Sequence, residues 1–168
     1  MSATDRYALD AAPGRLGRAQ DLLNTVGLAG HDDLLTDPQL AGEWAGAPLT
    51  EPDLQRLRTF RTDLQHLVSG SGEPSQRWVV EVGLELSSDA AVELTSAGKG
   101  AQQIIAAVLA GIYEAQLLDT WRRLKTCRNP RCVAAFYDRS KNNSRVWHSL
   151  ATCGNPANLK AHRARAKQ

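Results

Sequence analysis

Hydrophobic positions recur every three or four residues through much of the first 70 residues, which predicts amphipathic helices. One helix is expected over residues 15–25. A second should start where Asp37 can cap it and Pro38 can take its first position. The clearest start is at Thr50, a hydroxyl cap followed three residues later by Asp53. The inward face of this last helix is expected to carry Leu54, Leu57, Phe60, Leu64, Leu67 and Val68.

The periodicity changes after a loop rich in serine, glycine and proline at residues 69–75. Apolar and other side chains alternate over 78–86, which predicts a half-buried strand. Turn-forming residues at 87–89 and a second alternating stretch at 91–95 complete a two-stranded hairpin. Apolar positions over 101–118 then repeat at helical spacing and nearly surround the helix, so we expect this segment to be the central core helix.

Together these elements predict an α+β fold. We expect residues 1–121 to form a helical N-terminal domain with a β-hairpin and a long core helix, and residues 122–168 to form a separate small module. A chain of 168 residues with 42% hydrophobic residues fits this organisation.

The sequence gives no indication of a membrane association. The longest apolar run, at 104–112, is interrupted by Gly111 and is too short to cross a bilayer. The first ten residues include acidic side chains and lack the basic start and apolar centre of a signal peptide. We therefore expect a cytoplasmic protein.

The small net charge of +2 conceals a strong asymmetry. Residues 122–168 contain 12 Lys and Arg residues and one acidic residue, a net charge of +11, whereas residues 1–121 carry 8 basic and 17 acidic residues, a net charge of −9. A segment this basic attracts phosphates or another polyanion. The alternative is that it pairs with the acidic part of its own chain or of a partner subunit.

All three cysteines and one of the four histidines lie in this basic segment, as Cys127, Cys132, His148 and Cys153. Four residues separate the members of each pair and fifteen separate the pairs. This spacing is typical of a Cys3His zinc site, and an odd number of cysteines in a reducing compartment argues against disulfides. Four protein ligands leave no position for substrate, so we expect one structural Zn2+.

The residues around the ligands predict a small treble-clef-like zinc finger. An Asn129-Pro130 turn would fold the first pair into a knuckle. Residues 133–137 and 145–147 would form an antiparallel hairpin that delivers His148.

A helix is expected to follow the second ligand pair. Asn155 would be its N-cap and Pro156 its first residue, which puts Cys153 just before the helix. His162 could compete as the fourth ligand, but two turns inside that helix it would be poorly placed to share an ion with Cys153, so His148 is favoured.

Several motifs of the basic segment resemble the CGNR-type zinc finger of bacterial proteins: residues 127–132, 136–140, 142–145, Trp147 and 153–155. Residues 21–26 and 33–38 are similar to the opening of the ABATE domain that precedes this finger in a family of stress-related transcription regulators. The family has a cysteine where this chain has His148, a replacement that zinc accepts, and an arginine where it has Pro156, so any contact of that arginine is missing. The resemblance implies a DNA-binding regulator.

Arginine and lysine side chains of the finger are the candidate contacts to nucleic acid, because a planar guanidinium suits phosphate and guanine. The candidates on the knuckle, the following loop and the final helix are Arg128, Arg131, Arg139, Lys141, Arg145, Lys160, Arg163 and Arg165.

Two other classes of function are compatible with parts of this pattern. The zinc could stabilise a protein-interaction or RNA-binding module without sequence-specific DNA readout; in RNA recognition Phe136 and Tyr137 would stack on bases, although beside the metal they fit a small core better. A zinc enzyme is disfavoured because Asp138 is the only acid in the finger and no open ligand position is expected. The N-terminal domain is expected to bind an effector or to mediate homodimerisation.

Overall fold

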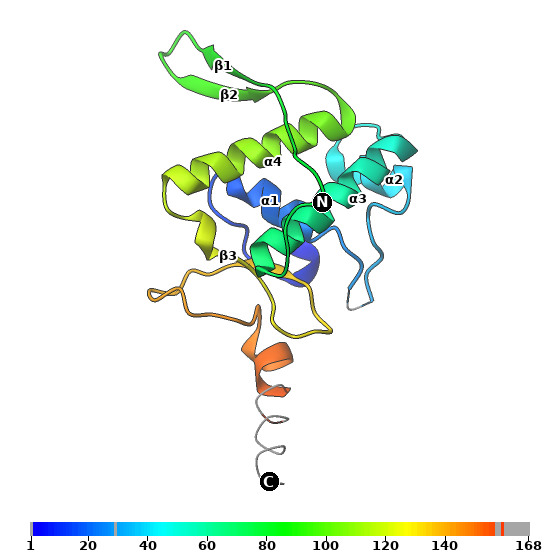
Figure 1. Ribbon diagram of the computed structural model, residues 1–168, viewed down its shortest axis with the longest axis vertical. Helices are drawn as coiled ribbons and strands as arrows, with labels where there is room; N and C mark the ends of the chain where they lie inside the picture. Colours follow the sequence, from blue (N-terminus) through cyan, green and yellow to red (C-terminus); the bar gives the residue numbers. More distant parts are fainter. Residues whose placement is uncertain (1, 29, 157–158, 160–168) are drawn as a thin grey trace.

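The computed structural model describes residues 2–28, 30–156 and 159 and confirms the α+β fold (Figure 1). Helices form the centre of the molecule, one hairpin projects at one end, and the metal-ligand segment lies at the opposite end. The elements are α1 (Leu16–Leu23), α2 (Pro38–Ala45), α3 (Glu51–Ser69), β1 (Val82–Leu86), β2 (Val92–Ser96), α4 (Gly100–Leu117), β3 (Leu124–Thr126) and β4 (Ala135–Tyr137).

The predicted helix starts are confirmed by their caps. The Asp37 side chain accepts hydrogen bonds from the backbone N–H groups at the start of α2, and Pro38 takes the first helical position. Thr50 and Asp53 form a reciprocal capping box at the start of α3. Asp53 also accepts a hydrogen bond from the backbone N–H of Ala101 at 2.9 Å, so one carboxylate fixes the starts of both α3 and α4.

This shared cap requires a glycine. Gly100 has a φ of +55°, and a Cβ at this position would lie 2.5 Å from Oδ1 of Asp53. A larger residue would therefore be strained and would also clash with the carboxylate.

Helices α1, α3 and α4 pack against one another around fully buried side chains such as Leu22, Leu57 and Ile105. Helix α4 is the central helix of this core, but it is not covered on all sides: Tyr113 is 58% and Leu117 69% exposed. The expectation of an almost fully surrounded helix was therefore wrong for one side of its C-terminal turns, whereas Ile112 and Ala115 of the same turns are buried.

Two positions on α3 also differ from the expected pattern. Leu67, expected inside, is 49% exposed, whereas the polar Asp63 is 3% exposed. Asp63 accepts hydrogen bonds from the backbone N–H of Ser75 at 2.9 Å and from Nε1 of Trp78 at 2.7 Å. The carboxylate can be buried because it holds the loop that follows the helix.

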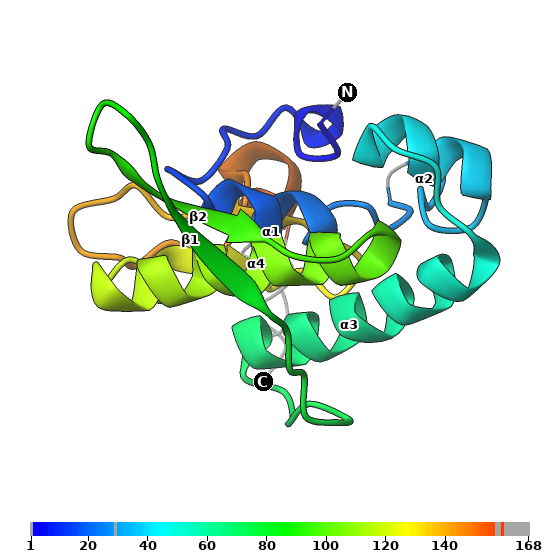
Figure 2. The same ribbon diagram turned by 90° about the horizontal axis from the view of Figure 1, so that it is seen from above.

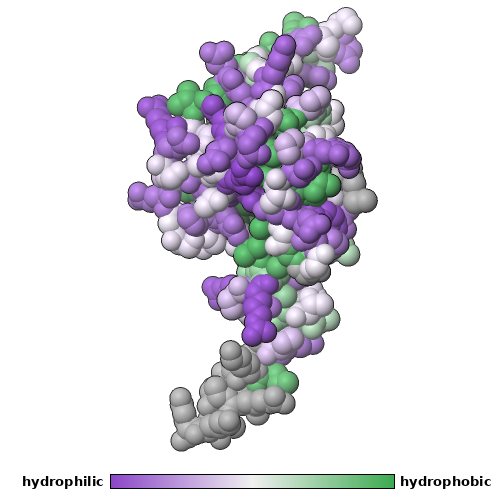
Figure 3. Space-filling model, turned by 90° about the vertical axis from the view of Figure 1, so that its right-hand side faces the viewer, coloured by the Kyte–Doolittle hydropathy of each residue, from purple (hydrophilic) through white to green (hydrophobic). Residues whose placement is uncertain are grey.

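The β1–β2 hairpin is present, but its predicted half-burial was wrong. Leu84 and Leu86 are 75% and 71% exposed, and they pair with Leu94 and Val92 in the antiparallel register. The start of the expected strand instead packs on the core, with the ring of Trp78 4.9 Å from that of Phe60. The paired strands then cross over α1 and α4 (Figure 2), and apolar side chains reach the surface at this end (Figure 3).

The hydrophobic core continues beyond residue 121, because Leu124 of β3 and Ala135 of β4 are buried with residues of the helices. Asn24, fully buried, holds Ala135 at both backbone groups: its side chain accepts from the N–H at 2.8 Å and donates to the carbonyl at 3.0 Å. The division of the chain into domains at residue 121 stays a prediction.

Within the described ranges, no helix is both long and apolar enough to span a bilayer.

Replacing Asn24 with alanine should weaken this junction. The N–H of Ala135 would be left buried without a partner, so we expect Asn24→Ala to lower the free energy of unfolding by about 2–3 kcal/mol. Urea unfolding of the metal-loaded protein measures this change, with the exposed Asn142→Ala as the control. Equal stability of the two variants would contradict the structural role of Asn24.

Candidate metal centre

A short hairpin brackets the first ligand pair. Strand β3 pairs with β4, with Leu124 opposite Tyr137 and Thr126 opposite Ala135. The backbone N–H of Cys127 donates to the carbonyl of Ala134 at 3.0 Å and extends the ladder to the metal ligands. The knuckle is therefore the tip of a hairpin whose base lies in the core.

The predicted hairpin between residues 133–137 and 145–147 was wrong. The second segment is not a strand, and one hydrogen bond, from the backbone N–H of Arg128 to the carbonyl of Val146 at 3.0 Å, holds it beside the knuckle. β3 pairs with one edge of β4, and on the other edge the Asn24 side chain takes the backbone groups of Ala135, so residues 145–147 do not pair with β4.

Asp138 organises the loop that follows β4. Its fully buried carboxylate accepts hydrogen bonds from Nζ of Lys125 at 2.8 Å, from the backbone N–H of Ser140 at 2.9 Å and from that of Arg145 at 2.8 Å. Although burial alone would raise it, these bonds hold the pKa of Asp138 well below its ordinary value. Sequence reasoning treated Asp138 as an isolated acid and missed this role.

Asn129 shapes the knuckle as its Asn-Pro turn predicts. Its side-chain oxygen accepts from the backbone N–H of Arg131 at 3.1 Å, and its carbonyl accepts from the N–H of Cys132 at 2.7 Å. Its amide nitrogen also lies 3.3 Å from the sulfur of Cys153 and donates to it. One side chain therefore forms the turn of the first ligand pair and contacts the second pair.

The second ligand pair is held by a helical turn that starts earlier than predicted. A π-helical segment, Leu150–Gly154, begins after Ser149, whose side chain accepts from the backbone N–H of Thr152. Asn155 has helical backbone angles, so its predicted role as N-cap was wrong. Cys153 thus lies inside the first turn rather than before it.

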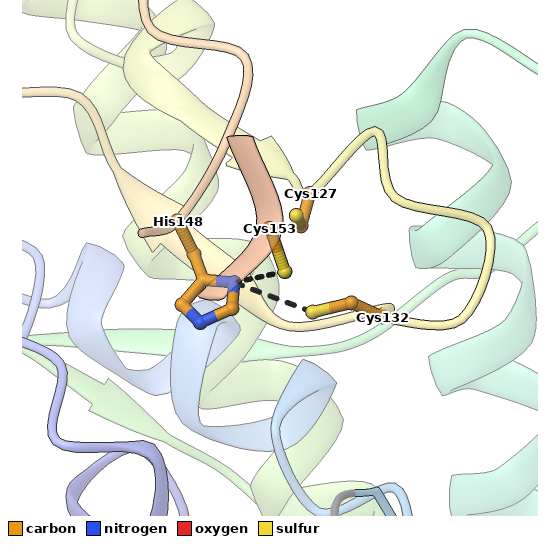
Figure 4. A group of neighbouring side chains, drawn as sticks. All are labelled: Cys127, Cys132, His148 and Cys153. Carbon is orange, nitrogen blue, oxygen red and sulfur yellow. Dashed lines mark hydrogen bonds between the residues drawn. The ribbon is translucent and has the colours of Figure 1, made fainter. Parts of the chain in front are cut away.

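The four predicted ligands come together in space. One donor atom from each of Cys127, Cys132, His148 and Cys153 lies within 4.8 Å of all the others. Nδ1 of His148 points at the sulfurs of Cys132 and Cys153, at 3.3 and 3.6 Å (Figure 4). A tetrahedral zinc with ordinary bond lengths separates such donors by about 3.5 Å. His162, the competing candidate, lies outside the described residues.

The surroundings of His148 and Cys153 favour the deprotonated forms that bind a metal ion. Burial lowers the pKa of His148, and the charge of Arg145 lowers it further, which favours the neutral imidazole that binds metals. Burial would raise the pKa of Cys153, but hydrogen bonds from Asn129 and neighbouring thiols reverse the shift.

Cys132 behaves differently from Cys153. Burial and the neighbouring Cys127 raise the pKa of Cys132 to about 12. A thiolate at this position at neutral pH therefore needs a cation beside it.

The donor set suits a closed four-coordinate metal site. Three sulfurs and one imidazole nitrogen are ligands that zinc binds tetrahedrally. A cavity of about 460 Å3 adjoins the cluster, lined by Arg131 and His148 among others. With all four positions supplied by protein, a substrate in this cavity would have no place on the metal.

The candidate nucleic-acid contacts fall into three groups. Arg128, Arg131 and Lys141 are exposed. Arg139 and Arg145 are exposed too, but they donate to backbone carbonyls of Ala11 and His148, both at 2.7 Å. The remaining candidates lie outside the described residues: Lys160, Arg163 and Arg165.

A comparison with protein families supports this assignment for the C-terminal part of the chain. Residues 123–166 match the family model of the CGNR zinc finger, and the match includes all four ligands. No curated protein matches the chain. Residues 123–166 are thus similar to a CGNR zinc finger and bring together a Cys3His ligand set that could hold a metal ion.

Substitutions of His148 test the ligand set. His148→Cys restores the four-cysteine set and should keep one zinc per chain, whereas His148→Ala should lose the ion to a chelator under conditions in which the wild type retains it. Metal analysis after dialysis measures both. The exposed His66→Ala is the control, and full zinc retention by His148→Ala would exclude His148 as a ligand.

Asp138 should make the stability of the finger depend on pH. Because its folded-state pKa is depressed, its contribution is complete well above 3.8, the ordinary value, and is lost as the pH falls through the folded-state value. Asp138→Asn should lower the free energy of unfolding by about 2 kcal/mol near pH 7, since it removes the charged partner of the partly buried Lys125 amine, which keeps only its hydrogen bonds to the carbonyls of Asn143 and Arg145.

Urea unfolding of both proteins from pH 7 down to about 2, with the exposed Glu73→Gln as control, measures this effect, because the contribution is lost only below the ordinary pKa of 3.8. The difference between wild type and Asp138→Asn should shrink towards the acid end. A difference that stays constant with pH would contradict the assignment.

Proposed function

We propose that this protein is a DNA-binding transcription regulator in which one structural Zn2+ holds a basic finger. The observation that carries the proposal is a basic groove of about 500 Å3 beside the knuckle, lined by Lys125, Arg128 and Arg145 together with Asn143 and Ser144. Cations, amides and hydroxyls in one groove are the groups that contact phosphates and sugars.

The positive charge of this region is only partly cancelled within the protein. Residues 122–156 carry eight basic residues and one acidic residue, a net charge of +7. The Arg139 and Arg145 guanidinium groups donate to neutral carbonyls, which orient them without neutralising them. Lys125 is paired with Asp138 and Arg122 with Asp119, so most of the positive charge stays available to an anion.

The contacts of the aromatic side chains favour duplex DNA over stacked single-stranded RNA. Phe136 is 2% exposed, and Tyr137 is half-buried beneath the Arg139 guanidinium, whose carbon lies 5.5 Å from the ring centre. Neither ring offers an open face for a base. A zinc-stabilised protein-interaction or RNA-binding module remains the alternative.

We also propose that the zinc has no catalytic role, because its four ligands come from the protein and Asp138, the acid in the finger, is fully buried. The proposal for the N-terminal part is that it binds an effector or mediates homodimerisation.

The arginines of the knuckle test DNA binding without disturbing the loop. Arg128→Gln with Arg131→Gln should weaken binding to a labelled duplex and reduce the slope of log K against log salt concentration by about 2, one for each lost phosphate contact. Fluorescence anisotropy at several salt concentrations measures both quantities. Arg56→Gln with Arg77→Gln removes the same charge from the acidic part and should leave the slope unchanged.

An unchanged slope in the knuckle variant would contradict the proposed interface. Selection of bound fragments from random and genomic duplexes separates a regulator, which enriches one motif, from a nonspecific binder, which enriches none.

A further inference from the structure

A second cavity lies far along the chain from the metal ligands, among α1, α2 and α4. It has a volume of about 320 Å3 and is lined by Trp44, Ile104 and Val108 together with Arg18 and Asp21. It adjoins a more open cavity of about 520 Å3, with which it shares Arg18, Asp21, Ser96 and Ala107. Pockets that bind small molecules start at about 300 Å3, so the inner cavity suits a small ligand.

One wall of the inner cavity is a fixed aromatic ring. Trp44 is half-buried, and its Nε1 donates a hydrogen bond to Oδ2 of Asp21 at 2.8 Å. The indole is therefore held in one orientation before any ligand arrives. Ile104 and Val108 of α4 add apolar surface, and this combination favours a flat apolar group.

The polar side of the cavity is lined by Asp21 and Arg18, which differ in how many hydrogen-bond partners their side chains have. Asp21 accepts hydrogen bonds from the hydroxyl of Ser2, from the backbone N–H of Thr4 at 2.9 Å and from Trp44, so both of its oxygens are occupied. Arg18 lies one turn away on α1, yet no ion pair joins it to Asp21 in the described part of the chain.

Arg15, the N-cap residue of the same helix, differs from Arg18 because its guanidinium has partners within the protein. It pairs with Glu114 at 3.2 Å and donates to the carbonyl of Leu94 at 2.8 Å. The side chain of Arg18 has no such partner among residues 2–28, 30–156 and 159. It is the cation in the inner cavity that can receive an anion.

We propose that this cavity binds a small organic acid with a flat apolar body, its carboxylate on Arg18 and its ring against Trp44. A planar guanidinium binds a carboxylate through two parallel hydrogen bonds, and the geometry leaves that fork free. The ligand site lies outside the finger and does not depend on whether the finger binds DNA.

Phenylacetate is a suitable probe, and phenylacetamide is its matched neutral control. Titration into the full-length, metal-loaded protein is followed by the NMR signal of the Trp44 indole N–H, which Trp44→Phe identifies. We expect phenylacetate to shift this signal and to bind at least about tenfold more tightly than the amide, because the amide lacks the charge that Arg18 recognises.

Three variants locate the site. Arg18→Gln should weaken phenylacetate binding by about 10- to 100-fold and abolish the preference over the amide. Ala107→Leu, which fills the cavity without changing its charge, should weaken binding of both compounds. Arg77→Gln removes a cation that lines a separate apolar cavity beside Trp78, and it should have no effect.

Three results would overturn the proposal. The first is the absence of any shift of the Trp44 signal with phenylacetate, salicylate or indole-3-acetate up to about 10 mM. The second is phenylacetate binding that Arg18→Gln leaves unchanged, and the third is binding that Arg77→Gln weakens instead. DNA binding is measured separately by anisotropy, so failure of either proposal leaves the other testable.

Discussion

The structure of the C-terminal segment depends on the convergence of three sulfurs and one imidazole nitrogen within 4.8 Å. Buried thiols resist ionisation and neighbouring thiolates repel one another. The cysteines of this cluster can therefore be thiolates together only when a cation lies between them. Around it residues 122–156 contain short elements: a three-residue strand on each side of the knuckle, an irregular loop and a helical turn at the second ligand pair. Apart from Leu124 and Ala135, which share the core of the helices, the segment is too small to build a hydrophobic core of its own, and the metal site stabilises it instead.

The sequence predicted best those features whose cause is local. Ligand spacing, the caps at Asp37 and Thr50 and the Asn-Pro turn are each decided by residues a few positions apart, and all of them were found. The pairing of β3 with β4 was missed because three-residue strands are too short to show a recognisable alternation of apolar and polar residues. The exposed hairpin was misjudged because alternation shows which side chains share a face but not whether another element covers that face.

Buried polar side chains were the other source of error. Asn24, Asp63 and Asp138 each hold backbone groups of a distant or irregular segment, so their role depends on contacts that composition does not reveal. Asn24 is the C-cap of α1, and the same helix carries Arg18 and Asp21 on the side of the inner cavity. Helix α1 thus has one face towards that cavity and another towards the strand that leads to the metal ligands.

The two hydrogen bonds between Asn24 and Ala135 limit how this finger could be exchanged between proteins. A recombination event that moved residues 122–168 alone would transfer every metal ligand but would leave behind the side chain that satisfies the backbone of β4. The protein that received the finger would need its own side-chain amide beside Ala135, where Asn24 lies in this chain. Inheritance of the finger is thereby tied to a helix more than a hundred residues earlier in the chain, and natural shuffling should favour the two together.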